Sequence, residues 1–200
     1  MNKPYNYDNI SIHTDPVQLG GHYCVIKKVT EGENKNGRPQ IVIYIDFDQQ
    51  DIQPGYFKKM YDADSRSDKK WGAAGTFYIT MGANEEYYNR SIKAFVTAFE
   101  DSNNCTAVWG DKWAAQFTNK KIGAVYGEEE WLDNSKDELR KSRKIRFFCD
   151  VHKAKEQDIP NFRAYKGDLR TQTTNMATTA SESGFMDFPD DTGDDGFPFK

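Results

Sequence analysis

The sequence has no hydrophobic run of the roughly 18 residues that a membrane-spanning helix needs, so we expect no transmembrane segment. Residues 1–5 contain no apolar stretch of the kind that begins a signal peptide, so we expect no secretory signal. Cysteine is also scarce: Cys24, Cys105 and Cys149 are odd in number and far apart. This count disfavours a disulfide framework and indicates a reducing, cytoplasmic location.

Several catalytic signatures are missing as well. The sequence contains no phosphate-cradling Gly-Lys-Ser or Gly-Lys-Thr loop and no dinucleotide-binding glycine pattern. Residues 128–130 with Asp150 would make a poor metal cluster, because consecutive strand residues point to opposite faces. Two Cys–His pairs support zinc only weakly: His22 with Cys24, and Cys149 with His152. We therefore expect no cofactor, no metal and no catalysis, with a metal-dependent nuclease as one alternative.

Aromatic residues are plentiful. They make up 14% of the 200 residues, which supplies the core of one folded domain with appendages. The charge is uneven: residues 167–200 hold seven acids and two bases, whereas the rest of the chain holds 24 acids and 25 bases. A near-neutral body with an acidic end indicates a nucleic-acid binder or an interaction tail, with a merely solubilising end as the alternative.

Alternating apolar and polar residues predict five β-strands. Asn36-Gly37 predicts a hairpin loop between the first two, because both residues tolerate positive φ. The five expected strands are residues 22–30, 40–48, 75–81, 120–131 and 144–153.

The same alternation predicts which side chains share a sheet face. In the second strand the core face should hold Ile41, Ile43, Ile45 and Phe47. In the last strand one face should hold Ile145, Phe147, Cys149 and Val151. The opposite face of that strand should then hold Arg146, Phe148, Asp150 and His152.

Residues 85–100 have the periodicity of an amphipathic helix, which Asn84 and the acids after it should begin. A short helix is expected over 111–117, and the polar segment 51–74 is expected to be a loop. Five strands with one amphipathic helix between strands three and four predict a mainly β protein, a five-stranded Greek-key barrel of the OB type. A five-stranded α+β sheet is left open.

The chain should divide into four parts. These are an N-terminal arm (1–17), an OB-like domain (18–165), a flexible linker (166–184) and a disordered acidic tip (185–200). The tip combines acids with Phe-Pro-Phe, so that its aromatic end can enter an apolar pocket while its acids meet basic rim residues.

This tip resembles the C-terminal tip of bacterial single-stranded DNA-binding proteins, in which a flexible linker leads to an acidic run that closes on Pro-Phe. The matching residues are Asp187, Asp190, Asp191, Asp194, Asp195, Phe197, Pro198 and Phe199. The resemblance implies that replication and repair enzymes are recruited by Asp190, Asp191, Asp194, Asp195, Phe197, Pro198 and Phe199. Lys200 is a departure, because the family tip ends on Phe.

The body is similar to single-stranded DNA-binding proteins of phages that infect Gram-positive bacteria. The similarity lies in residues 20–29, 35–44 and 121–131. It implies non-sequence-specific binding of single-stranded DNA during phage-type replication, recombination and repair, in the cytoplasm of a host cell. The oligomeric state is left open, a homo-oligomer included.

A binder of this kind needs cations for phosphates and rings for bases, each stacked base contributing about 1–3 kcal/mol. Phe77, Phe95, Phe99 and Phe147 are expected in the core. The DNA-contacting residues are predicted to be Lys27, Lys35, Arg38, Tyr44, Phe57, Lys58, Lys59, Tyr61, Lys69, Lys70, Trp71, Arg143, Arg146 and Phe148. A protein-only adaptor that acts through the tip is the other alternative.

Overall fold

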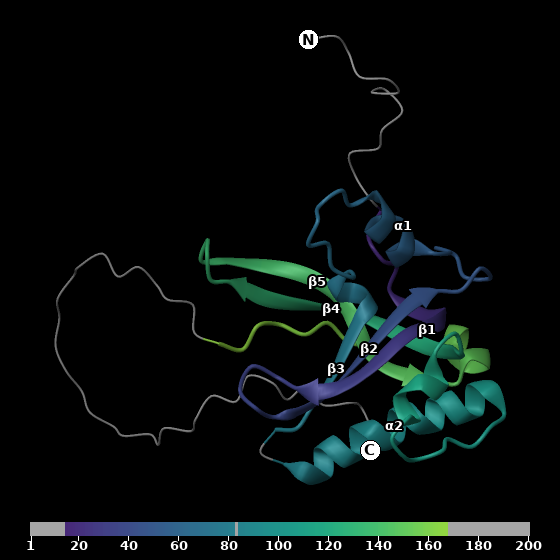
Figure 1. Ribbon diagram of the computed structural model, residues 1–200. Coiled ribbons are helices and arrows are strands. Elements are labelled where there is room, and N and C mark those ends of the chain that lie inside the picture. The colour runs from purple at the N-terminus through teal and green to yellow at the C-terminus, as the bar shows by residue number, and fades with distance from the viewer. Residues whose placement is uncertain (1–14, 83, 168–200) are drawn as a thin grey trace, which may run out of the picture.

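The structure is a computed structural model that describes residues 15–82 and 84–167. Its centre is one antiparallel sheet of five strands in the order β3-β2-β1-β4-β5 (Figure 1). The strands are β1 Gly20–Glu33, β2 Pro39–Phe47, β3 Thr76–Thr80, β4 Lys121–Asp133 and β5 Glu138–Cys149. The prediction of a mainly β protein with five strands is confirmed.

The β1–β2 hairpin follows the predicted pattern. Its turn includes Gly37, whose φ of 72° is one that glycine adopts without strain. Ile41, Ile43 and Ile45 are buried, because the alternation along β2 turns them all toward the core. The register shifts between Ile26 and Lys28, where β1 carries one extra residue in a β-bulge.

Two α-helices and three short 3-10 helices accompany the sheet. They are α1 Tyr56–Ala63, η2 Ala73–Gly75, α2 Glu85–Asn103, η3 Trp113–Phe117 and η4 Val151–Glu156. Helix α2 lies between β3 and β4 in the chain, as predicted, and Asn84 begins it by accepting a hydrogen bond from the backbone N–H of Tyr87 at 3.2 Å. The short helix expected over 111–117 is η3.

The prediction that residues 51–74 form a loop is wrong in part, because α1 forms within this segment. No side chain next to α1 caps its N-terminus. Instead Asp46, on β2, accepts a hydrogen bond from the backbone N–H of Phe57 at 2.9 Å. A cap supplied by a distant strand leaves no local sequence signal, which is why the helix was not predicted.

The predicted faces of the last strand are also wrong. Tyr126 pairs with Ile145 and Val125 pairs with Phe147, so that Arg146 is the extra residue of a β-bulge. The bulge reverses the alternation, and both Ile145 and Phe148 face the core. Strand β5 also ends at Cys149, four residues before the predicted end, and η4 begins at Val151.

The core fills the concave side of the sheet beneath α2 and η3. Phe117 of η3 contacts two rings of α2, with ring centroids 5.0 Å from Phe95 and 4.7 Å from Phe99. Phe77 of β3 meets Phe148 of β5 with centroids 5.1 Å apart, so side chains join the two edge strands of the sheet. Burying each such ring contributes about 1.5–3 kcal/mol.

Among the described helices, none combines the length and apolar character that crossing a bilayer requires. The predicted tip and all but two residues of the predicted linker lie outside the described residues.

Candidate nucleic-acid interface

The sheet has an outer face on β1, β2 and β3, on the side opposite the core. Tyr44 pairs with Lys28 on one side and Thr76 on the other. Val42 lies two residues away on β2 and pairs with Tyr78 of β3. Paired residues share a face, so the two tyrosines lie diagonally on this surface, where Tyr78 is 57% exposed. We call Lys28, Thr30, Val42, Tyr44, Thr76 and Tyr78 the outer face.

The bulge in β1 decides which lysine joins the outer face. Lys28 is exposed and pairs with Tyr44, whereas Lys27, which was predicted, is the extra residue and is half-buried. Burial raises the pKa of Asp46, and the nearby Lys27 charge partly opposes that rise. Lys27 therefore lies near the buried carboxylate that caps α1.

The β1–β2 hairpin carries two further predicted cations, Lys35 and Arg38, both on exposed positions of the turn. The Asn34 side chain accepts hydrogen bonds from the backbone N–H groups of Asn36 at 2.9 Å and Arg38 at 3.0 Å. These bonds fix the turn at the end of the sheet next to the outer face.

Trp71 and Tyr61 form a second aromatic group beyond the end of β3, where both are half-buried and Trp71 packs against the core. The last β2–β3 pair is Tyr44–Thr76, and the Trp71 indole N–H donates to the carbonyl of the next β2 residue, Ile45, at 2.9 Å. Tyr61 lies 5.6 Å from Trp71 between ring centroids, and Lys69 Nζ lies 4.5 Å from the Tyr61 ring centre. The structure thus brings together three predicted residues, Tyr61, Lys69 and Trp71.

The remaining lysines of this region are solvent-facing. Lys58 and Lys59 are exposed on α1, and Lys70 is exposed just before Trp71. Lys58 forms an i,i+4 ion pair with Asp62 on the same helix surface. These three lysines are close to Tyr61 and Trp71 in the sequence, and none of them is on a strand.

Three predicted contact residues are buried instead, which corrects the prediction. Phe57 is 1% exposed because the Asp46 cap holds α1 against the core. Phe148 is 6% exposed because of the β5 bulge. Arg146 is 7% exposed and donates to the Glu128 carbonyl at 2.7 Å. None of the three side chains presents a surface on which a base could stack or a strand could lie.

Arg143, the last predicted residue, is half-buried. Its guanidinium donates to the carbonyl of Val17 at 2.6 Å and lies 3.8 Å from a carboxylate oxygen of Glu128. It therefore holds the N-terminal segment against β5.

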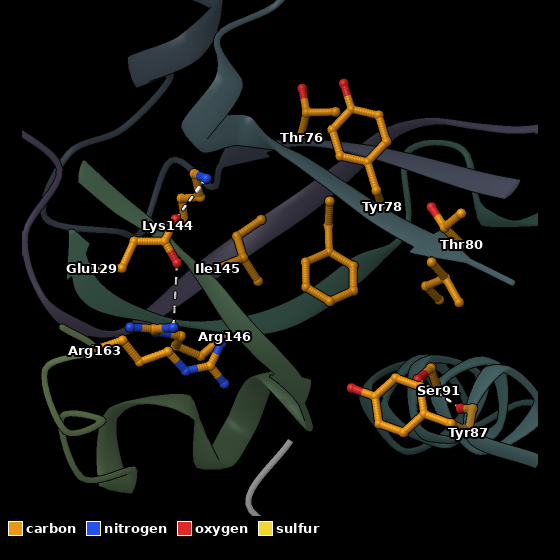
Figure 2. A pocket seen from close by; sticks show the side chains of 12 residues that line it. Thr76, Tyr78, Thr80, Tyr87, Ser91, Glu129, Lys144, Ile145, Arg146 and Arg163 are labelled. Atoms are coloured by element: carbon orange, nitrogen blue, oxygen red, sulfur yellow. Dashed lines mark hydrogen bonds and ion pairs between the residues drawn. The ribbon is translucent and has the colours of Figure 1, made fainter. Parts of the chain in front are cut away.

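A cleft lies where β3 and β5 face each other without pairing, and we call it the seam cleft (Figure 2). Its volume is about 260 Å³. At one end Glu129 binds Lys144 Nζ at 2.6 Å and Arg146 Nη1 at 3.4 Å, and Arg163 lies beside them. At the other end, on α2, are Tyr87 and Ser91.

Three residues that line the outer face or the seam cleft are absent from the predicted contact residues: Lys28, Tyr78 and Lys144. Tyr78 alternates with the apolar Phe77 and Ile79, so its outward direction was readable from the spacing of two. Lys28 depends on a bulge and Lys144 on the β4–β5 register, and neither has a local signal.

A buried polar centre lies at the other end of β1. The His22 ring, stacked on Phe47, has Nδ1 2.9 Å from an Asp51 oxygen and Nε2 3.0 Å from the Gln18 carbonyl. Burial would raise the pKa of Asp51, but the His22 hydrogen bond and charge, with backbone N–H donors, lower it to about 2. The other Asp51 oxygen lies 3.1 Å from Lys155 Nζ. The centre ties β1 to η4 and is structural.

Two of the three thiols, Cys24 and Cys149, are poorly suited to nucleophilic chemistry. Burial raises the pKa of Cys24 well above its usual value and that of Cys149 to about 12, so neither thiol ionises readily at neutral pH. Within residues 15–82 and 84–167, no three His, Cys, Asp or Glu side chains are grouped as metal ligands.

Comparison with models of known protein families gives no match for this chain, and a search of curated proteins gives none either.

Proposed function

We propose that the protein binds single-stranded DNA without sequence specificity and that the strand crosses the outer face. The observation that carries the proposal is the diagonal placement of Tyr44 and Tyr78, with Lys28 paired to Tyr44. Unpaired bases stack on rings of this kind, and lysines neutralise the phosphates between them. Tyr78 is 57% exposed on the edge strand β3, so its ring is accessible to a base.

The strand order supports a more specific fold, which we also propose. An OB barrel is a partly open five-stranded Greek-key barrel whose strands 2 and 3 and neighbouring loops bind oligonucleotides. The order β3-β2-β1-β4-β5, with α2 between strands three and four, fits such a barrel left open between β3 and β5. The outer face and the Lys35–Arg38 turn lie on the strands and loop that bind oligonucleotides in that fold.

The aromatic pair Tyr61–Trp71 is a second support. Trp71 and Tyr61 follow Tyr44 beyond the end of β3, and Lys58, Lys59, Lys69 and Lys70 lie in the same segment. A strand leaving the sheet at Tyr44 would meet this group next. We therefore expect the DNA to run from the hairpin turn, across β2 and β3, toward α1.

The biological role follows from the resemblance and stays a proposal: protection of single strands in phage-type replication, recombination and repair, in a host cytoplasm, without catalysis. Residues 190–199 would recruit partner enzymes. Their acids would also compete with DNA for the cationic surface, so deletion of residues 185–200 should tighten DNA binding at low salt. Unchanged affinity after the deletion would count against that competition.

A fluorescence titration tests the proposed function. Poly-dT should quench the emission of Trp71, and the affinity should fall as salt rises, because each phosphate contact releases counterions. Trp71→Phe is the control for the reporter and should lose most of the quenching while it retains binding by gel shift. An absence of any binding at low salt would favour the adaptor, and magnesium-dependent cleavage of the DNA would favour the nuclease.

A further inference from the structure

The seam cleft adjoins the outer face but is a separate cavity. Thr76, Tyr78 and Thr80 of β3 line it, and two of them belong to the outer face. Because β3 is an edge strand, its free side opens directly onto the cleft. A strand that passes over Tyr78 on its way toward α1 therefore runs beside the seam cleft, and one of its nucleotides can turn into it.

The cleft combines apolar walls with one charged end. Ile79 and Ile145 line it from β3 and β5, and the Tyr87 ring enters from α2. The charged end is formed by Lys144 and Arg146 around Glu129. Apolar side chains beside a charged end that contains Lys144 suit a ligand that carries both a ring and an anion.

Glu129 already supplies one carboxylate to the charged end. Its carboxylate lies between two cations, with Lys144 Nζ at 2.6 Å and Arg146 Nη1 at 3.4 Å. The Lys144 side chain is 50% exposed, whereas that of Arg146 is 4% exposed. An ammonium group has three donors, so Lys144 can turn a remaining N–H toward a phosphate while Arg146 keeps Glu129 in place.

The size of the cleft limits the ligand. Its volume of about 260 Å³ lies just below the range of about 300–1,000 Å³ for pockets that hold drug-sized molecules. A single base with its sugar fits that scale, and a length of folded peptide does not.

We propose that the seam cleft binds one nucleotide of the strand on the outer face, with its base between Tyr87 and Ile145 and its phosphate at Lys144. The inference rests on the proposed function and adds a site to it. The nucleotide turns off the outer face at the edge of β3, while the rest of the strand continues toward α1.

Two variants test the site by affinity. Ser91→Leu fills the cleft from α2, with Ser91→Ala as the matched control, because Ser91 is buried and lines the cavity. Lys144→Gln removes the phosphate partner, with Lys136→Gln on the β4–β5 turn as the control. Ser91→Leu and Lys144→Gln should each weaken (dT)30 binding by about fivefold or more, the lower end of one stacked base. Circular dichroism and thermal melting verify that each variant folds.

Photocrosslinking distinguishes a failure of the cleft site from a failure of DNA binding on the outer face. A (dT)30 strand that contains 5-iododeoxyuridine should crosslink to both Tyr78 and Tyr87, as read by mass spectrometry. Crosslinks at Tyr78 alone, with parental affinity in both variants, would overturn the cleft site and leave the outer face intact. No crosslink at either tyrosine and no binding would overturn both. If Ser91→Leu impaired binding of a synthetic peptide of residues 185–200 but not of (dT)30, the cleft would be a peptide site and the proposal would be wrong.

Discussion

Tyr44 and Tyr78 lie on one face of the sheet, diagonally across the β2–β3 ladder, because Tyr44 pairs with Thr76 and Val42 pairs with Tyr78. Diagonal neighbours on a sheet are about 7–8 Å apart, which places the two rings close enough to serve one strand. No single segment of sequence contains this relationship. It arises from the register of two strands separated by α1 and its flanking loops.

Replacing the two tyrosines should weaken DNA binding with little effect on folding. Tyr44→Ala and Tyr78→Ala should each cost about 1–3 kcal/mol of binding free energy to poly-dT, because each ring stacks a base. Trp109→Ala is the control, since Trp109 is exposed and stacks on Trp113 on the core side of the sheet. Fluorescence anisotropy of labelled poly-dT measures the three affinities. Equal losses in all three would mean that the outer face has no special role.

The lysine on the outer face should be visible in the salt dependence. Lys28→Gln should reduce the slope of log affinity against log salt by about 0.7, the value for one phosphate contact on a single strand. Lys112→Gln removes an exposed charge before η3 and should leave the slope unchanged. Titrations at four salt concentrations give the slopes, and a Lys28→Gln slope equal to that of the parent contradicts the contact.

Glu129 should weaken DNA binding in the parent protein, because its charge neutralises Lys144. Glu129→Gln should therefore raise the affinity for poly-dT at low salt by several-fold, and the gain should shrink as salt screens the charges. Glu138→Gln removes an exposed carboxylate at the start of β5 and is the matched control. A gain of the same size in both variants would mean that the change in net charge explains the higher affinity and that the Glu129–Lys144 pair has no special role.

The carboxylate of Asp51 should stabilise the fold in a defined pH range. Its pKa is lowered to about 2 in the folded protein, against about 3.9 in an unfolded chain. The stabilisation is thus complete above about pH 5 and is lost as the pH falls toward 2, and it amounts to about 2–3 kcal/mol. Urea unfolding of the parent and Asp51→Asn should show a gap at pH 7 that narrows by pH 3. A gap that stays constant with pH would show that the charge of Asp51 is not what stabilises the fold.

The bulge in β5 makes a prediction about stability. Phe148→Ala should lower the free energy of unfolding by about 3–5 kcal/mol, because it empties a ring-sized space beside Phe77 and Phe95. Phe147→Ala should cost clearly less, since Phe147 is half-buried. Denaturant unfolding of both variants measures the two losses. A larger loss for Phe147→Ala than for Phe148→Ala would mean that Phe147 faces the core and that the bulge is absent.

The fold could be predicted from the sequence where one face of a strand packs against the core along the whole strand. Along β2 the apolar residues keep a strict spacing of two, and Ile41, Ile43 and Ile45 are buried as expected. The prediction failed where long-range contacts decide the outcome. The bulges at Lys27 and Arg146 change which side chains face outward, and Asp46 caps a helix from another element. A one-residue change in register moves every later side chain to the other face.

The candidate site shows the same division. Alternation along the second strand predicts that Tyr44 faces outward, and rings interleaved with cations predict Tyr61, Lys69 and Trp71 as contact residues. The structure places Tyr61, Lys69 and Trp71 together. Phe57 and Phe148 also have aromatic and cationic neighbours in the sequence, but their side chains are buried. Composition indicates which segment could bind a DNA strand. The register of the β-strands determines which side chains of that segment face outward.

Hydrogen–deuterium exchange with and without poly-dT tests most directly whether the strand lies on the outer face. Bound DNA should slow exchange in peptides that cover residues 28–44 and 76–80, while residues 95–117, which hold the second half of α2 and η3, should exchange as before. Protection confined to α2 and η3, or no protection anywhere when binding is saturated, would contradict the proposed path of the strand.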